Sequence, residues 1–312
     1  MTLPHFHVGC DISRDIIDVF DASTGRFSRI ANTATALQAW LRTYDDRPAR
    51  FVFEATGPYG VPLRRALLEA GMTGIEINPM RARRFAQAAG IAAKTDRVDA
   101  RLLAMMADRL ELQPTPSFQS ARHALKSLIT RRDQLVAMGA DERKRLLQCH
   151  DDGVRESLRR ILAVLDDELQ TVSRAIEAAL AADPAMARDR HLLMSIPGIG
   201  PVTAAVLLTM MPELGSASPK AVASLAGCAP HADDSGKRSG KRHVRGGRPR
   251  VLRALYMAAL SASRRNSRFG EKYRRMRNDP LAPKAAKVAL IAIARKIIVT
   301  ANALIRDQTA FA

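Results

Sequence analysis

The sequence predicts a mixed α/β domain in its first part and a mostly helical chain after it. The α/β prediction rests on five short apolar segments, bounded by turn residues, before residue 80. The helical prediction rests on long segments after residue 120 whose apolar residues recur every three or four positions. A length of 312 residues permits two domains, or a domain with an extension, each with a sizeable core.

Three short strands open the chain in close succession. We expect them at residues 6–13, 16–23 and 25–33, and the third is bounded by the turn residues Gly25 and Asn32. A helix is then predicted over residues 34–44, where apolar side chains recur at helical spacing.

Helix and strand alternate after that point. Residues 50–57 and 73–79 predict a fourth and a fifth strand, with a helix over 61–71 between them that Gly71 closes and with Pro79 as the final stop. Three strands followed by alternating helix and strand is the order typical of a ribonuclease-H-like mixed sheet.

The middle of the chain predicts two long helices. Residues 123–148 and 154–180 carry apolar residues at helical spacing, and the break around CHDDG separates them. Two antiparallel helices forming a coiled-coil-like arm is the simplest arrangement. Two interpretations remain open: an arm for oligomerisation, or an ordinary helical hairpin packed on its own core.

A third region opens with SIPGIGPVTAAVLLTM at residues 195–210. Pro197, Gly198 and Gly200 predict a tight turn between two helices, whose amides could face a phosphate as in a helix-hairpin-helix element. A plain turn between helices is the alternative. The predicted domains are therefore 1–118, 119–190 and 191–312.

Four acidic residues stand where a carboxylate is structurally awkward. Asp11 follows FHVGC, Glu54 follows FVF, and Asp96 and Asp99 lie in KTDRVDA. Carboxylates that converge from separate elements can hold Mg²⁺, which neutralises charge during phosphodiester cleavage. Asp96 and Asp99 are three residues apart, so a helix places both on nearly the same face. The sequence thus favours a metal-dependent enzyme acting on nucleic acid.

Each of these acids also has a simpler interpretation. Asp15, Asp18 and Asp21 lie near the first strand too, as solvated or turn residues, so closeness in sequence is weak support for any single Asp. Asp96 could be a helix cap after Thr95. Glu54 is harder to explain in this way, because a turn of small residues follows it directly.

The chain is strongly basic. With 49 Lys and Arg against 31 Asp and Glu, its net charge is 49 − 31 = +18, which favours a polyanionic partner such as DNA or RNA. Seven cations and no acid lie between Gly236 and Arg250; the candidates for phosphate contact are Lys237, Arg238, Lys241, Arg242, Arg245 and Arg248. Ser235 and Ser239 lie beside these cations, and guanidinium groups can stabilise the transition state of serine attack on a phosphodiester. The alternative is that the two Ser-Gly pairs only make the loop flexible.

Other classes are disfavoured. The sequence shows no basic amphipathic helix with aromatic anchors and, by our interpretation, no apolar run long enough to span a bilayer, so we expect no membrane partner. Cys10, Cys149 and Cys228 form no CxxC pair, so neither a zinc ribbon nor a disulfide framework is expected. Nothing at the N-terminus resembles a signal peptide, and we expect a cytoplasmic protein.

These residues, taken together, resemble a known family over nearly the whole chain. Asp11, Glu54 and KTDRVDA, followed downstream by SIPGIGPVTAA, LAGCAP, DSG and GGRPRVLRALYMAA, are similar to the DEDD-type transposases of bacterial insertion sequences, relatives of the Piv DNA invertases. The resemblance implies a RuvC-like domain, similar to Holliday-junction resolvases, in which Asp11, Glu54, Asp96 and Asp99 hold Mg²⁺.

The resemblance also implies a transposase domain whose nucleophile, by its place in DSG, is Ser235, with Ser239 as a competitor. It implies DNA cutting and rejoining through a phosphoserine intermediate, guided by an element-encoded RNA. Donor and target duplexes need at least two active sites, so we expect a homo-oligomer, a dimer or a tetramer. The rivals are a junction endonuclease that uses metal-activated water and a non-enzymatic nucleic-acid-binding protein.

Overall fold

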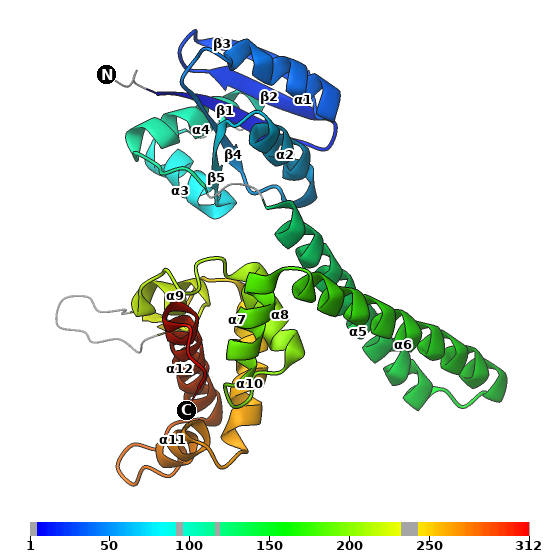
Figure 1. Cartoon of the computed structure of the whole chain (residues 1–312). Helices are drawn as coiled ribbons and strands as arrows, with labels where there is room; N and C mark the ends of the chain where they lie inside the picture. The colour runs from blue at the N-terminus through cyan, green and yellow to red at the C-terminus, as the bar shows by residue number, and fades with distance from the viewer. Residues whose placement is uncertain (1–4, 92–95, 116–118, 232–242, 312) are drawn as a thin grey trace. The chain divides into compact units, whose positions relative to one another are not determined.

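The computed structural model describes residues 5–91, 96–115, 119–231 and 243–311, and of Asp96, Ser120 and His231 it describes the backbone alone. Contacts divide the chain into two compact units, Met1–Ser120 and Ala121–Ala312. The first is a mixed α/β unit and the second is mostly helical, as the sequence predicts (Figure 1).

Unit 1 is built on a five-stranded mixed sheet in the order β3-β2-β1-β4-β5. The strands are β1 (Phe6–Ile12), β2 (Ile16–Asp21), β3 (Arg26–Ala31), β4 (Ala49–Glu54) and β5 (Thr73–Ile77). β2 runs antiparallel to both β1 and β3, whereas β1, β4 and β5 are parallel. All five predicted strands are confirmed, and the architecture is compatible with a DEDD nuclease-like domain.

Helices cover both faces of this sheet. They are α1 (Ala34–Leu41) with the 3₁₀ turn η1 (Arg42–Tyr44), the turn η2 (Gly57–Gly60), α2 (Val61–Glu69), α3 (Pro79–Ala88) and α4 (Asp96–Arg109). Alternation along the strands divides the core: Val8 and Phe51 pack with α1 and α2, whereas Val52 and Ile75 pack with α3 and α4. The sequence interpretation missed α3, although Asn78 caps it by accepting a hydrogen bond from the Met80 amide and Pro79 stands in its first turn.

Unit 2 consists of helices and one short ribbon. The helices are α5 (Ser120–Gln148), α6 (Asp152–Ala181), α7 (Pro184–Met194), α8 (Pro201–Met210), α9 (Pro219–Leu225), α10 (Pro249–Ser263), α11 (Arg268–Arg277) and α12 (Ala286–Asp307). The ribbon pairs β6 (Pro230–His231) with β7 (His243–Val244). The two long predicted helices are thus present as α5 and α6.

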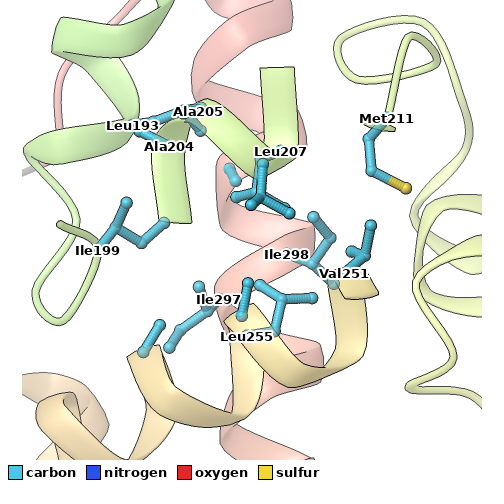
Figure 2. Packing of buried hydrophobic residues seen from close by; sticks show 14 of the residues in the cluster. Leu193, Ile199, Ala204, Ala205, Leu207, Met211, Val251, Leu255, Ile297 and Ile298 are labelled. Carbon is cyan, nitrogen blue, oxygen red and sulfur yellow. The ribbon is translucent and has the colours of Figure 1, made fainter. Parts of the chain in front are cut away.

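One apolar core runs through unit 2. Figure 2 shows Leu207 of α8, Leu255 of α10 and Ile297 of α12 gathered in this core. The same cluster continues into the long helices through Leu125 of α5 and Ile176 of α6. The part of the arm nearest the core therefore shares it, while a separate arm domain remains a prediction.

One helix corrects the expectation about apolar runs. By length and composition α12 could cross a bilayer, since its most apolar stretch has a mean hydropathy of 1.9. Half of that stretch is buried inside the protein, and Ile293, Ile297 and Ile298 are fully enclosed. The run exists because α12 is the central core helix of unit 2.

Candidate functional site

Helix α4 fixes the geometry of the first candidate site. It lies against β1 at Gly9, where an added Cβ would stand 1.9 Å from the Ala100 carbonyl oxygen. At the other end of α4, Asp108 lies near His7: burial lowers the pKa of His7, and the charge of Asp108 opposes that shift. Helix α4 therefore runs antiparallel to β1, and its first turn lies toward the carboxyl end of that strand.

Asp11 and Glu54 stand at this same end of the sheet. Cys10 pairs with Phe53 in the parallel register of β1 and β4, so the next residues on the two strands are Asp11 and Glu54. Asp11 shares the face of Gly9, the face that α4 covers, and Glu54 shares the face of Val52. Both acids are half-buried. Two of the four predicted carboxylates are thus neighbours on one face.

Helix α4 contributes the other two acids from its first turn. Asp96 begins the helix, and the half-buried Asp99 stands three residues later, directly before Ala100, the residue that contacts Gly9. The N-terminal end of a helix carries positive partial charge and favours nearby carboxylates. The side chain of Asp96 is not described, so its alternative role as a cap stays untested.

The donor chemistry suits Mg²⁺, which prefers carboxylate oxygens. Among the side chains that the structure describes, however, no group of three or more His, Cys, Asp or Glu residues lies close enough together to hold a metal ion. Asp96, the fourth predicted ligand, falls outside that search. The metal site therefore stays a prediction, supported by the shared face and strand end.

Asp18 is an acid of this region that the sequence interpretation set aside. It pairs directly with Asp11 across β1 and β2, so the two share a face. Its carboxylate accepts hydrogen bonds from Arg29 at 3.0 and 3.4 Å, and its side chain is 16% exposed. The alternation of buried Ile17 and Val19 around it was the available signal.

The nearby Asp21 faces the opposite way and stabilises the turn after β2. It accepts hydrogen bonds from the Ser23 and Thr24 amides and from Arg47. Burial alone would raise the pKa of Asp21, but hydrogen bonds from the Ser23 hydroxyl, the Ser23 amide and Arg47, together with the Arg47 charge, hold it below its ordinary value. Its interpretation as a turn residue is confirmed, but it is buried and not solvated.

Most of the second candidate centre lies outside the described residues. This applies to Ser235 and Ser239 and to the cations Lys237, Arg238, Lys241 and Arg242. On either side of these residues β6 pairs antiparallel with β7, with Pro230 opposite Val244. Gly247 packs on Gly227, where an added Cβ would stand 2.2 Å from the Gly227 nitrogen.

The described cations of the basic run differ in their surroundings. Arg245 is exposed. Arg248 precedes α10 and donates two hydrogen bonds to Glu213, at 2.7 and 2.6 Å, while Arg250 forms an ion pair with Asp133 of α5. A phosphate contact by Arg248 stays a prediction, and the geometry gives this residue a structural partner.

The PGIG turn packs against the core of unit 2. Gly198 has a φ of +96°, and an added Cβ would lie 2.3 Å from the Ala258 carbonyl oxygen of α10. Ile196 and Ile199 are buried beside it. This packing explains the glycine without a ligand, and a phosphate contact by the turn remains a proposal.

Comparison with known proteins defines the class of this chain. A model of DEDD transposases of the IS110 type matches residues 8–152, and a model described as the Transposase IS116/IS110/IS902 family matches residues 190–274. The first match spans Asp11, Glu54, Asp96 and Asp99. The second spans residues 235–250, which hold Ser235, Ser239 and the basic run and which we call the serine segment. The protein is an enzyme of the DNA transposase and recombinase class.

Its relatives narrow this class. The pilin gene-inverting proteins of Moraxella lacunata and Moraxella bovis are each 26% identical over 98% of this chain and 97% of their own length. The insertion element IS116 uncharacterized 44.8 kDa protein of Streptomyces clavuligerus is 30% identical over 60% of this chain and 44% of its own. The chain is thus similar to IS110/IS116 transposases and to pilin gene-inverting proteins.

Proposed function

We propose that this protein cuts and rejoins DNA with Asp11, Glu54, Asp96 and Asp99 as the acidic centre and Ser235 as the nucleophile. The observation that supports it best is the position of α4, whose first turn lies at the strand end that carries Asp11 and Glu54. We further propose that the unit is RuvC-like, and that an element-encoded RNA guides the homo-oligomeric protein.

The four carboxylates would hold Mg²⁺ through their oxygens, and the bound ion would neutralise charge on the phosphate under attack. Asp11 and Glu54 are positioned by the register of β1 and β4, and Asp99 by the packing of α4 on Gly9. Because backbone pairing and close packing set these positions, the acids need little rearrangement when DNA arrives.

Ser235 would carry out the covalent step. Its Oγ loses its proton to solvent or to a nearby base and bonds to phosphorus, while the bond to one bridging oxygen breaks and that oxygen takes up a proton to become a free hydroxyl end. A hydroxyl end of the second duplex then attacks the phosphoserine and releases the serine. The phosphoserine bond conserves the energy of the broken phosphodiester bond, so rejoining needs no nucleotide cofactor.

The nearby cations would bind the backbone. We propose that Lys237, Arg238, Lys241, Arg242, Arg245 and Arg248 contact phosphates near the serine. Such contacts position a nucleic acid without reading its sequence, which leaves target choice to base pairing with the guide RNA.

The test is a denaturing gel of the protein with labelled donor and target duplexes, flank RNA and Mg²⁺. We expect a covalent protein–DNA adduct with the native protein and with Ser239→Ala, and no adduct with Ser235→Ala. The Ser239 variant is a matched control, since both serines precede a glycine in the same segment. Cleavage without an adduct in every variant would favour the hydrolytic junction nuclease.

A further inference from the structure

Unit 2 contains a basic groove that lies apart from the 236–250 run. We call it the α12 groove; it has a volume of about 500 Å³ and is lined by Pro219, Lys220, Lys272, Ala292, Arg295, Lys296 and Val299. Helix α12 supplies four of the seven lining residues and packs against both α9, which supplies Lys220, and α11, which supplies Lys272. Three helices thus bring four cations to one hollow.

The cations of the α12 groove differ from Arg248 and Arg250 in their ion pairing. Within the part of the chain that the structure describes, Lys220, Lys272, Arg295 and Lys296 form no ion pair, and no carboxylate lines the groove. Arg248 and Arg250, by contrast, each hold a carboxylate. Four like charges in one hollow repel each other, and an anion that enters it removes that repulsion.

The four cations of the groove differ in how far they are buried. Lys272 and Arg295 are half-buried, while Lys220 and Lys296 are exposed. Burial raises the pKa of the neighbouring Cys228 to about 11, and the charge of Arg295 opposes that shift, which places the guanidinium near this buried thiol. A half-buried, unpaired cation lacks part of its hydration and gains more than a fully solvated one from an anionic partner.

The lining suits a sugar-phosphate backbone. Ala292, Val299 and Pro219 give an apolar lining for sugar carbons, and four cations line the same groove. Arg268 and Arg275 lie four residues before and three residues after Lys272 on α11, so they extend the basic side beyond the groove. The apolar side of α12 is already buried in the core and is not offered to a lipid bilayer.

We propose that the α12 groove binds the phosphate backbone of double-stranded DNA and forms a contact additional to the serine segment. The proposal depends on DNA as the partner of this enzyme class and not on Ser235 or the carboxylates. Binding of DNA of arbitrary sequence, measured without Mg²⁺, therefore tests it separately from strand cleavage.

The experiment measures binding of a labelled DNA duplex of arbitrary sequence against salt concentration. Lys220→Gln with Lys296→Gln removes two exposed charges and leaves the core intact. Lys126→Gln with Arg131→Gln is the matched control, since both residues are exposed on α5 and without an ion pair among the described residues. The logarithm of the DNA-binding constant falls linearly with the logarithm of the salt concentration, and each lost phosphate contact makes this slope shallower by about 0.9.

We expect Lys220→Gln with Lys296→Gln to make that slope shallower by up to about 1.8, twice the value for one contact. The control on α5 should change the slope less. Lys220→Arg with Lys296→Arg should restore binding, because backbone contact needs charge and not a particular base. Lys272→Gln with Arg295→Gln, checked by thermal unfolding, should weaken binding similarly.

Three results would overturn the proposal. Equal slopes for the groove and control variants would reduce the effect to net charge. A loss confined to an RNA duplex of the same sequence would assign the groove to RNA, and a loss confined to phosphatidylserine vesicles would assign it to a membrane surface.

Discussion

The two units of this protein place their charges in opposite ways. In unit 1, acids stand at neighbouring strand ends, where the β1–β4 register and the contact of α4 with Gly9 set their positions. In unit 2, cations gather where α9, α11 and α12 pack side by side. A sheet can thus hold a few carboxylates at defined positions, whereas packed helices bring cations from distant parts of the sequence to one surface.

The largest expected effect is a loss of DNA strand cleavage when Asp11, near the end of β1, is replaced. Asp11→Asn should lower DNA strand cleavage by about 100-fold or more, because a preorganised charged group at the reacting phosphate is lost. DNA binding and thermal unfolding should change little. Asp15→Asn is the control, since the Asp15 side chain is 82% exposed. Cleavage that survives Asp11→Asn would show that Asp11 is structural. It would contradict a catalytic role for the acids at the strand ends of unit 1.

The next effect concerns the close contacts that hold each unit. Gly9→Ala and Gly198→Ala each place a Cβ under 2.5 Å from a carbonyl oxygen, at 1.9 and 2.3 Å. Each should lower the free energy of unfolding of its own unit by about 1–3 kcal/mol or more through overpacking. Hydrogen exchange followed by mass spectrometry reports each unit separately.

Gly200→Ala is the control for these glycines, since no atom of the described residues lies within 4 Å of the added Cβ. Gly9→Ala should also lower cleavage, because it separates α4, and Asp99 with it, from β1. Gly198→Ala with unchanged stability would contradict the structural role assigned to the PGIG turn and would favour its phosphate-binding role.

A pH effect is expected at Asp21. Its pKa is lowered in the folded protein, so its contribution is complete above the unfolded value of about 3.9 and is lost as the pH falls through the folded value. Asp21→Asn should cost about 1.5–3 kcal/mol at neutral pH, the range for hydrogen bonds to charged groups. Denaturant unfolding at several pH values should show the difference from the native protein shrinking below about pH 4. A difference that does not depend on pH would assign the loss to packing.

The contrast between the units also explains what the sequence could predict. Short apolar segments bounded by turn residues identified the strands that hold Val8 and Phe51, and the carboxylates Asp11 and Glu54 stand near the ends of these strands. Asp18 was set aside because its closeness to Asp11 comes from strand pairing across a turn, which residue type alone does not reveal. The α12 groove was missed because Lys220, Lys272 and Arg295 are far apart in sequence and meet only through helix packing.

The smallest expected effect decides the role of Arg248. Glu213→Gln removes the charge that Arg248 holds through two hydrogen bonds. Burial would raise the pKa of Glu213, but Arg248 keeps it below its ordinary value, so this contribution also fades as the pH falls. Both side chains are about one-third exposed, at 35% and 33%, so we expect a loss of about 1 kcal/mol or less that shrinks in high salt.

The same variant tests the basic run, because it frees Arg248 for other anions. We expect the salt dependence of DNA binding to become steeper by about 0.9, because the guanidinium that Glu213 no longer holds is available to a phosphate. Arg248 would then belong to the DNA-binding surface that the sequence predicts. An unchanged slope would show that Arg248 serves only the packing of α10 on the core of unit 2.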